Sequence, residues 1–321
     1  MKKILIISSN RLGDCILSSG IIEYYKRKDA EINITFVCGP IPGSLFRFCR
    51  NIDRLIILKK RKYSFHWFYL WFLLFLTPWN DILDLRGTAT SYFLFAKKRT
   101  IYKNNKIDEN EHKVKVISRK VCNKILHPSI NIDQKNHPKK SKLVEVKKLK
   151  KTNKLVVLAP SANWIGKIWP IERFSQLINE LKKSRFFKNA VFLIIGPLEE
   201  KNLISELLKR NKSEILDLVG KTDLAEIFLI MKQCAIFIGN DSGLMHLAAL
   251  SGIPTVGLFG PSDAKKYHPW GTETLAISSL KTPEQLMGYQ GFDHKKCGSL
   301  MLDLEVKVVL KKIIEFYSKY Q

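Results

Sequence analysis

Residues 235–261 combine the residue types and spacing best suited to binding a ligand. The segment reads as an apolar run at 235–238, a polar turn flanked by glycines, a helix over 244–250 and a second apolar run at 255–259. Short apolar runs of this kind are typical of buried parallel strands. The free N–H groups at the start of the helix would then lie at the carboxyl edge of a sheet, where phosphates and other anions bind. The segment therefore predicts a site for an anionic ligand.

A single carboxylate, Asp14, stands at the first predicted turn from a strand to a helix. The strand-like run covers residues 3–8, and a helical pattern follows over 16–25. The turn has no GxGxxG pattern, so a dinucleotide site of the dehydrogenase type is not indicated. Two interpretations of Asp14 stay open at this point. Aspartate is a preferred helix N-cap, and a carboxylate at the edge of the first strand could also act on a bound ligand.

Strand-like and helical patterns alternate along the chain. Glycine, proline and asparagine gather where the strand-like runs end, and such alternation predicts parallel sheets with helices on both faces. The fold class is therefore α/β, with doubly wound, Rossmann-like sheets. The predicted strands cover residues 3–8, 34–38, 55–58, 82–85, 155–159, 191–195, 236–238 and 255–258.

The length of 321 residues exceeds one ordinary core and predicts two domains. Residues 131–153 are rich in lysine, asparagine and histidine, which favours a linker there. We therefore expect an N-terminal domain over residues 1–150 and a C-terminal domain over 151–321, facing a central cleft. We also consider a last helix that packs back on the N-terminal domain. The six cysteines show neither metal-site nor disulfide spacing, which fits a reducing cytosol and predicts no metal site.

The net charge of +25 is concentrated in the first half of the chain. Residues 1–150 hold 31 lysines and arginines against 12 acidic residues, whereas residues 151–321 hold 23 against 17. Such a field attracts an anionic partner, either nucleic acid or a phosphate-bearing lipid surface. A lysine-rich, solvated surface is the other interpretation. Because no aromatic and basic nucleic-acid motif accompanies the charge, we expect no nucleic-acid partner.

Residues 65–79 form an aromatic and aliphatic run directly after the four basic residues 59–62. The run is too short to span a bilayer core, which needs roughly 20 residues. One interpretation is a helix that lies in the headgroup region, with Trp67, Trp71 and Trp79 at the boundary. The other is a helix buried against the domain's own sheet, because runs of this length are often core helices.

Taken together, these motifs resemble those of the bacterial ADP-heptose:lipopolysaccharide heptosyltransferases, the ninth glycosyltransferase family. The most specific part is GNDSGLMH at residues 239–246, followed by FGPS at 259–262. Weaker matches are RLGD at 11–14, DILDLRG at 81–87, EHKV at 111–114, KIWP at 167–170 and GKT at 220–222. The resemblance implies the GT-B fold, in which two Rossmann-like domains face a central cleft.

The resemblance implies that the C-terminal domain binds a nucleotide-sugar donor. It assigns to Lys167 the neutralisation of the leaving diphosphate, a role that suits a flexible ammonium. We expect Asp241 to accept loop N–H groups or a donor hydroxyl, since a carboxylate repels a diphosphate. A surface lysine and a buried histidine are the other interpretations of Lys167 and His246. The further implied donor contacts are Ser161, Asn163, Glu200 with Glu199 as a one-residue alternative, Thr222, Ser242, Gly243 and His246.

On the acceptor side, the resemblance makes Asp14 the general base of an inverting transfer. Arg11, Gly13 and Arg86 match family motifs on the same side. The implied enzyme moves heptose from ADP-L-glycero-D-manno-heptose to the lipid A and inner-core acceptor of lipopolysaccharide. It would need neither cofactor nor metal, and would be a cytoplasmic, peripheral membrane protein on the cytosolic face of the bacterial inner membrane. Alternatives are another nucleotide sugar, a protein acceptor, or a non-catalytic basic adaptor for membrane or nucleic acid.

Overall fold

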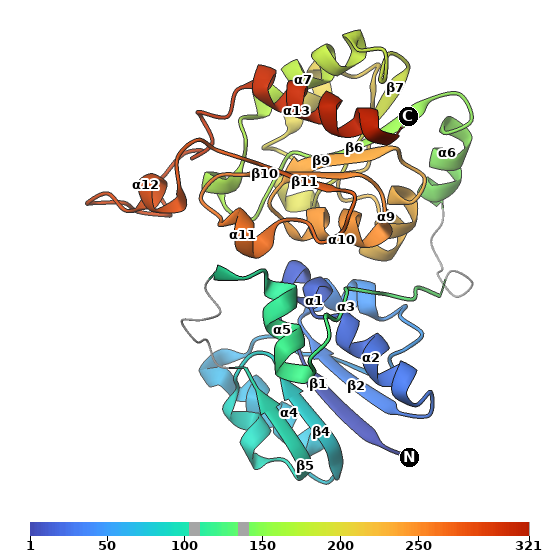
Figure 1. The fold of residues 1–321 in the computed structure, drawn as a ribbon, viewed down its shortest axis with the longest axis vertical. Helices are drawn as coiled ribbons and strands as arrows, with labels where there is room; N and C mark the ends of the chain where they lie inside the picture. Colours follow the sequence, from blue (N-terminus) through green and yellow to red (C-terminus); the bar gives the residue numbers. More distant parts are fainter. Residues whose placement is uncertain (103–109, 134–140, 321) are drawn as a thin grey trace. The chain divides into compact units, whose positions relative to one another are not determined.

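The computed structural model describes residues 1–102, 110–133 and 141–320, and the chain divides into two compact units (Figure 1). The first unit is Met1–Pro138 and the second is Lys139–Gln321. The boundary therefore falls earlier in the chain than the residue 150 predicted from composition. Each unit has its own parallel sheet and its own apolar core.

The linker predicted at residues 131–153 is partly a helix. Residues 134–140 lie outside the described residues, but Ser141–Leu149 forms helix α6 of the second unit. The carboxylate of Glu226 accepts hydrogen bonds from the backbone N–H groups of Lys142 and Leu143, at 2.9 and 3.0 Å. The first N–H groups of a helix have no partner within the helix. A distant, buried glutamate therefore supplies the hydrogen-bond acceptor that the lysine-rich local sequence lacks.

The described residues of the first unit form a five-stranded parallel sheet in the order β3-β2-β1-β4-β5. The central strands are apolar and buried, as strands covered on both faces must be. β5 escapes sequence prediction because its residues, AKKRTI, are mostly polar and stand at the sheet edge. The strands are β1 (Lys3–Ile7), β2 (Asn33–Cys38), β3 (Arg54–Ile57), β4 (Trp79–Asp84) and β5 (Ala96–Ile101).

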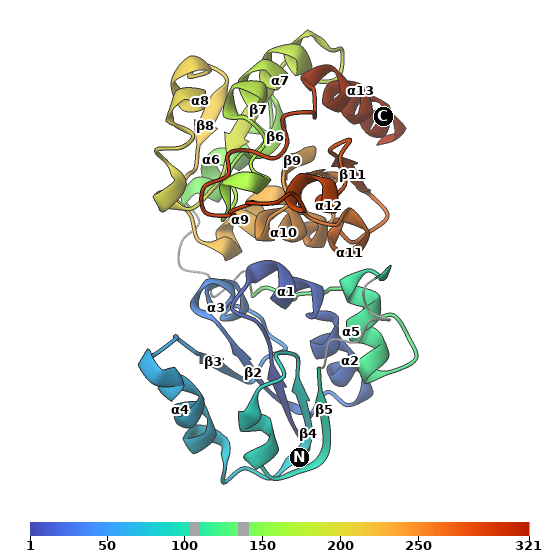
Figure 2. The same cartoon turned by 90° about the vertical axis from the view of Figure 1, so that its left-hand side faces the viewer.

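Helices cover both faces of this first sheet (Figure 2). Helix α4 lies on one face, and α2 and α5 lie on the other. Leu70 and Leu74 of α4 are fully buried in the core that the sheet forms on that face. The helices are α1 (Leu12–Leu17), α2 (Gly20–Lys28), α3 (Pro40–Phe46), α4 (Phe65–Leu74) and α5 (Lys113–Val121), with short 3-10 turns η1 (Lys62–Ser64) and η2 (Ala89–Phe93).

The helix predicted over residues 16–25 is broken into α1 and α2. The hydroxyl of Ser19 donates to the carbonyl of Ile16 at 2.8 Å between the two helices. A Cβ atom on Gly20 would lie 2.4 Å from the carbonyl oxygen of His127. A later segment of the chain therefore passes directly against α2, and only glycine fits there.

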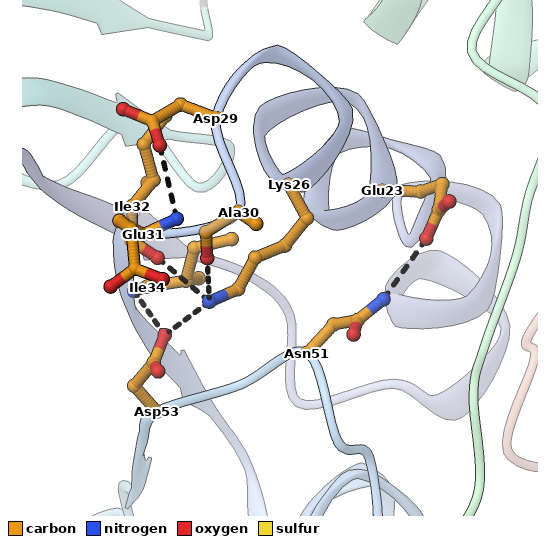
Figure 3. Close-up of polar contacts among 9 residues, drawn as sticks. All are labelled: Glu23, Lys26, Asp29, Ala30, Glu31, Ile32, Ile34, Asn51 and Asp53. Atoms are coloured by element: carbon orange, nitrogen blue, oxygen red, sulfur yellow. Dashed lines mark hydrogen bonds and ion pairs between the residues drawn. The ribbon is translucent and has the colours of Figure 1, made fainter.

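One lysine of the basic first unit has a structural task at the end of α2 (Figure 3). Lys26 donates to the carbonyl of Ile32 at 2.7 Å and to the carboxylate of Asp53 at 3.0 Å. Asp53 also accepts from the N–H of Ile34 at 2.8 Å. Lys26 thus ties the end of α2 to the starts of β2 and β3. A cation in the last turn also complements the helix dipole.

The described residues of the second unit form a six-stranded parallel sheet in the order β11-β10-β9-β6-β7-β8. The sequence does not predict β8 and β11, because β8 has three residues and β11 is a half-buried edge strand. The strands are β6 (Lys154–Ala159), β7 (Ala190–Ile194), β8 (Ile215–Asp217), β9 (Ile236–Asn240), β10 (Thr255–Phe259) and β11 (Thr274–Ser278).

Helices also cover both faces of the second sheet, with α7 and α13 on one face and α9 and α10 on the other (Figure 1). The last helix, α13 (Val306–Tyr317), buries Val309 and Ile313 in the core of the second unit. It therefore contributes to the core of this unit. The other helices are α7 (Ile171–Lys183), α8 (Ser205–Arg210), α9 (Leu224–Met231), α10 (Gly243–Ser251), α11 (Ala264–Tyr267) and α12 (Pro283–Met287).

Candidate functional site

In each unit, the strand order reverses between two neighbouring central strands. These pairs are β1 with β4 in the first sheet and β6 with β9 in the second. The loops that follow such a pair leave in opposite directions and open a crevice in which ligands of α/β sheets bind. Asp14 and Arg86 follow β1 and β4, while Lys167 and Asp241 follow β6 and β9. The topology thus brings the predicted residues to the expected crevice of each unit.

Asp14 is not the N-cap of its helix. The N-cap position of α1 is Arg11, and Asp14 lies half-buried in the first turn. Its carboxylate accepts a hydrogen bond from the hydroxyl of Ser9 at 3.1 Å. No cation pairs with it among the described residues. A carboxylate held by one hydroxyl keeps lone pairs available, so the geometry permits it to accept a proton.

The loop after β4 is shaped by Asp84, a fully buried carboxylate. Asp84 accepts backbone hydrogen bonds from Arg86, Gly87 and Thr88 at 2.9, 3.0 and 2.7 Å. Gly87 has a φ of 68°, a conformation that glycine adopts readily. Asp84 belongs to the motif at residues 81–87, but its role could not be predicted from the sequence. Its role is to fix the backbone from which Arg86 projects.

Arg86 links the two loops at the first crevice. Its guanidinium donates to the side-chain oxygen of Asn10 at 3.1 Å and lies 4.7 Å from the centre of the Trp67 ring. Burial lowers the pKa of the Arg86 guanidinium, and burial together with Arg86 lowers the pKa of His66. The positive charges of Arg86, Lys60 and Arg61 therefore all act on His66. Arg11 is exposed and Gly13 is half-buried beside Asp14.

In the second unit, Lys167 and Asp241 form an ion pair. The ammonium nitrogen of Lys167 lies 2.7 Å from a carboxylate oxygen of Asp241, and their side chains are 28% and 8% exposed. In place of the loop N–H groups that were one predicted partner of Asp241, the carboxylate contacts this ammonium, and the other predicted contact, with a donor hydroxyl, stays a prediction. The carboxylate instead holds the ammonium at the carboxyl end of β9. The pair faces solvent on the lysine side, where an anion can reach the ammonium.

Asn240 positions the loop that carries Lys167, and this role was not predicted from the sequence. Its side chain is fully buried, donates to the carbonyl of Pro160 at 2.8 Å and accepts from the N–H of Trp169 at 3.1 Å. The indole of Trp169 in turn donates to the carbonyl of Leu304 at 2.7 Å. The signal in the sequence is the polar asparagine at the end of an apolar strand.

Two hydroxyl oxygens of the second unit, Ser242 Oγ and Thr222 Oγ1, are buried without a hydrogen-bond partner among the described residues. Ser242 is the N-cap residue of α10, yet its side chain does not cap the helix. An unsatisfied buried hydroxyl costs about 1–3 kcal/mol. Native structures rarely leave such groups unpaired unless a ligand or water completes them. Ser242 and Thr222 were both predicted to contact the nucleotide-sugar donor.

The remaining predicted donor residues follow the strands of the second sheet. Ser161, after β6, is buried, and a Cβ atom on Gly196 would lie 3.1 Å from its hydroxyl. Asn163 on the same loop is exposed. After β7, Glu200 is half-buried and Glu199 is exposed. Gly243 begins α10, and His246 is buried one turn further on.

Within residues 1–102, 110–133 and 141–320, no group of three or more histidine, cysteine or acidic side chains could hold a metal ion. A structural relative, the dodecameric glycosyltransferase TibC of enterotoxigenic E. coli, is described as iron-containing. It matches with 13% identity and a TM-score of 0.57, over 100% of this chain and 77% of TibC. That likeness concerns the fold alone.

The sequence matches a known family over most of its length. The family model for glycosyltransferase family 9 (heptosyltransferase) matches residues 87–289. The chain is 25% identical to lipooligosaccharide heptosyltransferase 2 of Campylobacter jejuni serotype O:6 over 324 aligned residues. The alignment covers 97% of this chain and 98% of the relative. A shorter match of 122 residues is 32% identical to lipopolysaccharide heptosyltransferase 3 of Escherichia coli K12 and spans 34% of that enzyme.

The structure of an E. coli ADP-heptose lipopolysaccharide heptosyltransferase II has the same fold. It matches with a TM-score of 0.76 and 16% identity, over 100% of this chain and 99% of that chain. This likeness confirms the predicted GT-B fold class.

Proposed function

Because this chain belongs to glycosyltransferase family 9, the heptosyltransferases, we propose that it moves heptose from ADP-L-glycero-D-manno-heptose to the lipid A and inner-core acceptor of lipopolysaccharide. Curated relatives are named lipopolysaccharide and lipooligosaccharide heptosyltransferases, and a structural relative is named as an ADP-heptose enzyme. Family membership makes the protein a glycosyltransferase. The donor and the acceptor are our proposal.

The observation that carries the donor assignment is the arrangement after β6 and β9. The Lys167 ammonium, the unpartnered Ser242 hydroxyl and the first N–H groups of α10 stand at the same edge of the sheet. The ammonium carries positive charge, and the hydroxyl and the N–H groups can donate hydrogen bonds. A diphosphate is bound by groups of both kinds. The ammonium of Lys167 would exchange part of its contact with Asp241 for the diphosphate.

In the proposed reaction, the acceptor hydroxyl oxygen bonds to the anomeric carbon while the bond from that carbon to the ADP oxygen breaks. Asp14 takes the hydroxyl proton on the face opposite the leaving group, and the configuration inverts. ADP leaves with the electron pair of the broken bond, and Lys167 neutralises the developing charge. Glu200, or Glu199, would hold the ribose, and Ser161, Asn163, Thr222 and His246 would contact the rest of the donor.

We assign the anionic acceptor to the first unit, which carries the larger share of the net positive charge. Arg11, Gly13 and Arg86 lie beside Asp14 or at the same sheet edge. Because the proposed acceptor is anchored in lipid, the enzyme would work as a peripheral protein on the cytosolic face of the bacterial inner membrane. Lys167 and the start of α10 would neutralise the diphosphate without a metal ion.

The test is transfer to heptose-deficient lipopolysaccharide, followed by mass spectrometry. Purified protein is incubated with ADP-heptose and, in matched reactions, with UDP- and GDP-sugars, each with and without EDTA. We expect the acceptor to gain one heptose from ADP-heptose alone, with the same yield in EDTA. Transfer from another nucleotide sugar would overturn the donor assignment. A folded protein that binds ADP yet yields no product would overturn the acceptor assignment.

A further inference from the structure

The first unit exposes an unusual number of aromatic side chains on α4 and the neighbouring turn η2. On α4 and just beyond it, one stripe holds Phe65, Phe68, Tyr69, Phe72 and Leu76, spaced by three or four residues and all exposed. Phe68 and Phe72 are 62% and 61% exposed. Beside them, Tyr92, Phe93 and Phe95 are also exposed. We call these eight residues the aromatic surface.

The aromatic surface is one continuous part of the first unit. The indole of Trp71 on α4 donates to the carbonyl of Phe93 at 3.0 Å, which joins the helix to the turn. The rings of Trp71 and Phe75 stack at 4.8 Å, and Phe72 lies 5.9 Å from Phe75. The opposite side of α4 packs in the core, because Leu70 and Leu74 are buried against the sheet. The helix is therefore apolar all round, with one side in the core and the other in solvent.

The chain around the aromatic surface is cationic. Residues 59–62 before α4 and residues 97–99 of β5 are lysines and arginines, and all are exposed. Between Asp53 and Asp108 the acidic residues are Asp81 and Asp84. Both are buried, at 8% and 0% exposure. Aromatic side chains beside basic residues are the combination that binds the headgroup region of an anionic bilayer.

A bilayer surface fits this region better than a second copy of the chain. Two copies meeting through the aromatic surface would bring their lysines and arginines together, and like charges repel. Insertion across the membrane is not indicated, since no helix of the described residues is long and apolar enough to cross it. An exposed apolar helix side that stands beside basic residues can instead lie in the plane of the interface.

We propose that the aromatic surface docks the first unit on an anionic lipid bilayer. Trp67 connects this surface to the predicted acceptor site, because it belongs to α4 and contacts the guanidinium of Arg86. Docking would thus place the loop that carries Arg86 close to a lipid-anchored acceptor. Only this last step rests on the proposed function, since lipid binding can be measured without any substrate.

The experiment measures flotation of the full chain with vesicles, using phosphatidylcholine alone or mixed with phosphatidylglycerol. The test variant is Phe68→Glu with Phe72→Glu, and the matched control is Leu280→Glu with Leu302→Glu, two exposed leucines of the second unit. We expect the wild type and the control to float with anionic vesicles. The test variant should lose at least about tenfold in bound fraction, since two phenylalanines no longer insert.

A second measurement separates this inference from the proposed function. Transfer to a deacylated, water-soluble acceptor should be the same in the test variant and the wild type, because neither phenylalanine is placed in the reaction. Normal soluble transfer without any binding of the wild type to anionic vesicles would overturn the docking inference alone. A concentration-dependent dimer that only the test variant loses, again without vesicle binding, would assign the aromatic surface to a second copy.

Discussion

An aspartate stands at the expected crevice of each unit, but the two aspartates have different partners. Asp14 in the first unit is held by the hydroxyl of Ser9, whereas Asp241 in the second unit is paired with an ammonium at 2.7 Å. A carboxylate that must accept a proton has to keep a lone pair free, while one that holds a cation is occupied by it. The partner of each carboxylate, more than its residue type, therefore sets its role.

The strongest test of the first crevice is Asp14→Asn. The carboxamide keeps the shape of the side chain but cannot take a proton, so kcat should fall by about 10²- to 10⁴-fold. Affinity for ADP should not change, because the base and the donor site lie in different units. Steady-state kinetics and calorimetric ADP titration measure the two effects. The matched control is Glu31→Gln, an exposed carboxylate of the first unit, and wild-type turnover in Asp14→Asn would disprove the assignment.

The corresponding change in the second crevice is Lys167→Met. Loss of the ammonium should lower kcat by about 10²- to 10³-fold, since the leaving diphosphate is no longer neutralised. The change also leaves the buried Asp241 carboxylate without its cation, which should lower the melting temperature. Adding Asp241→Asn should restore the melting temperature without restoring turnover. If turnover also returned, Lys167 would act only by neutralising Asp241. The control is Lys188→Met, which changes an exposed lysine.

The smallest expected effect concerns the unpartnered hydroxyls of the second crevice. Ser242→Ala and Thr222→Val should each weaken ADP binding by about tenfold, the loss of one hydrogen bond to a charged group. The melting temperature of the ligand-free protein should stay the same or rise, because a buried hydroxyl without a partner is removed. Thr272→Val, at an exposed threonine of the second unit, should change neither value. A lower melting temperature with unchanged ADP affinity would show that the hydroxyls are structural.

The central strands of both sheets could be read from the sequence with small errors at their ends. Strands such as β1, β6 and β9 are apolar because helices cover both their faces. The edge strands β5 and β11 and the short β8 could not be found this way, because they are polar, half-buried or too brief to show a pattern. Whether residues 65–79 are core or interface was also open, and the structure shows one buried and one exposed side.

The α/β class, the family and the residues at the ends of the central strands could be predicted from the sequence, because they depend on local apolar runs and short motifs. Tertiary structure alone decided the pairing of Lys167 with Asp241, the break at Gly20 and the capping of α6 by Glu226. Each depends on a contact between segments far apart in the chain. Local propensity carries no information about such contacts, since they form only when the chain folds and brings distant segments together.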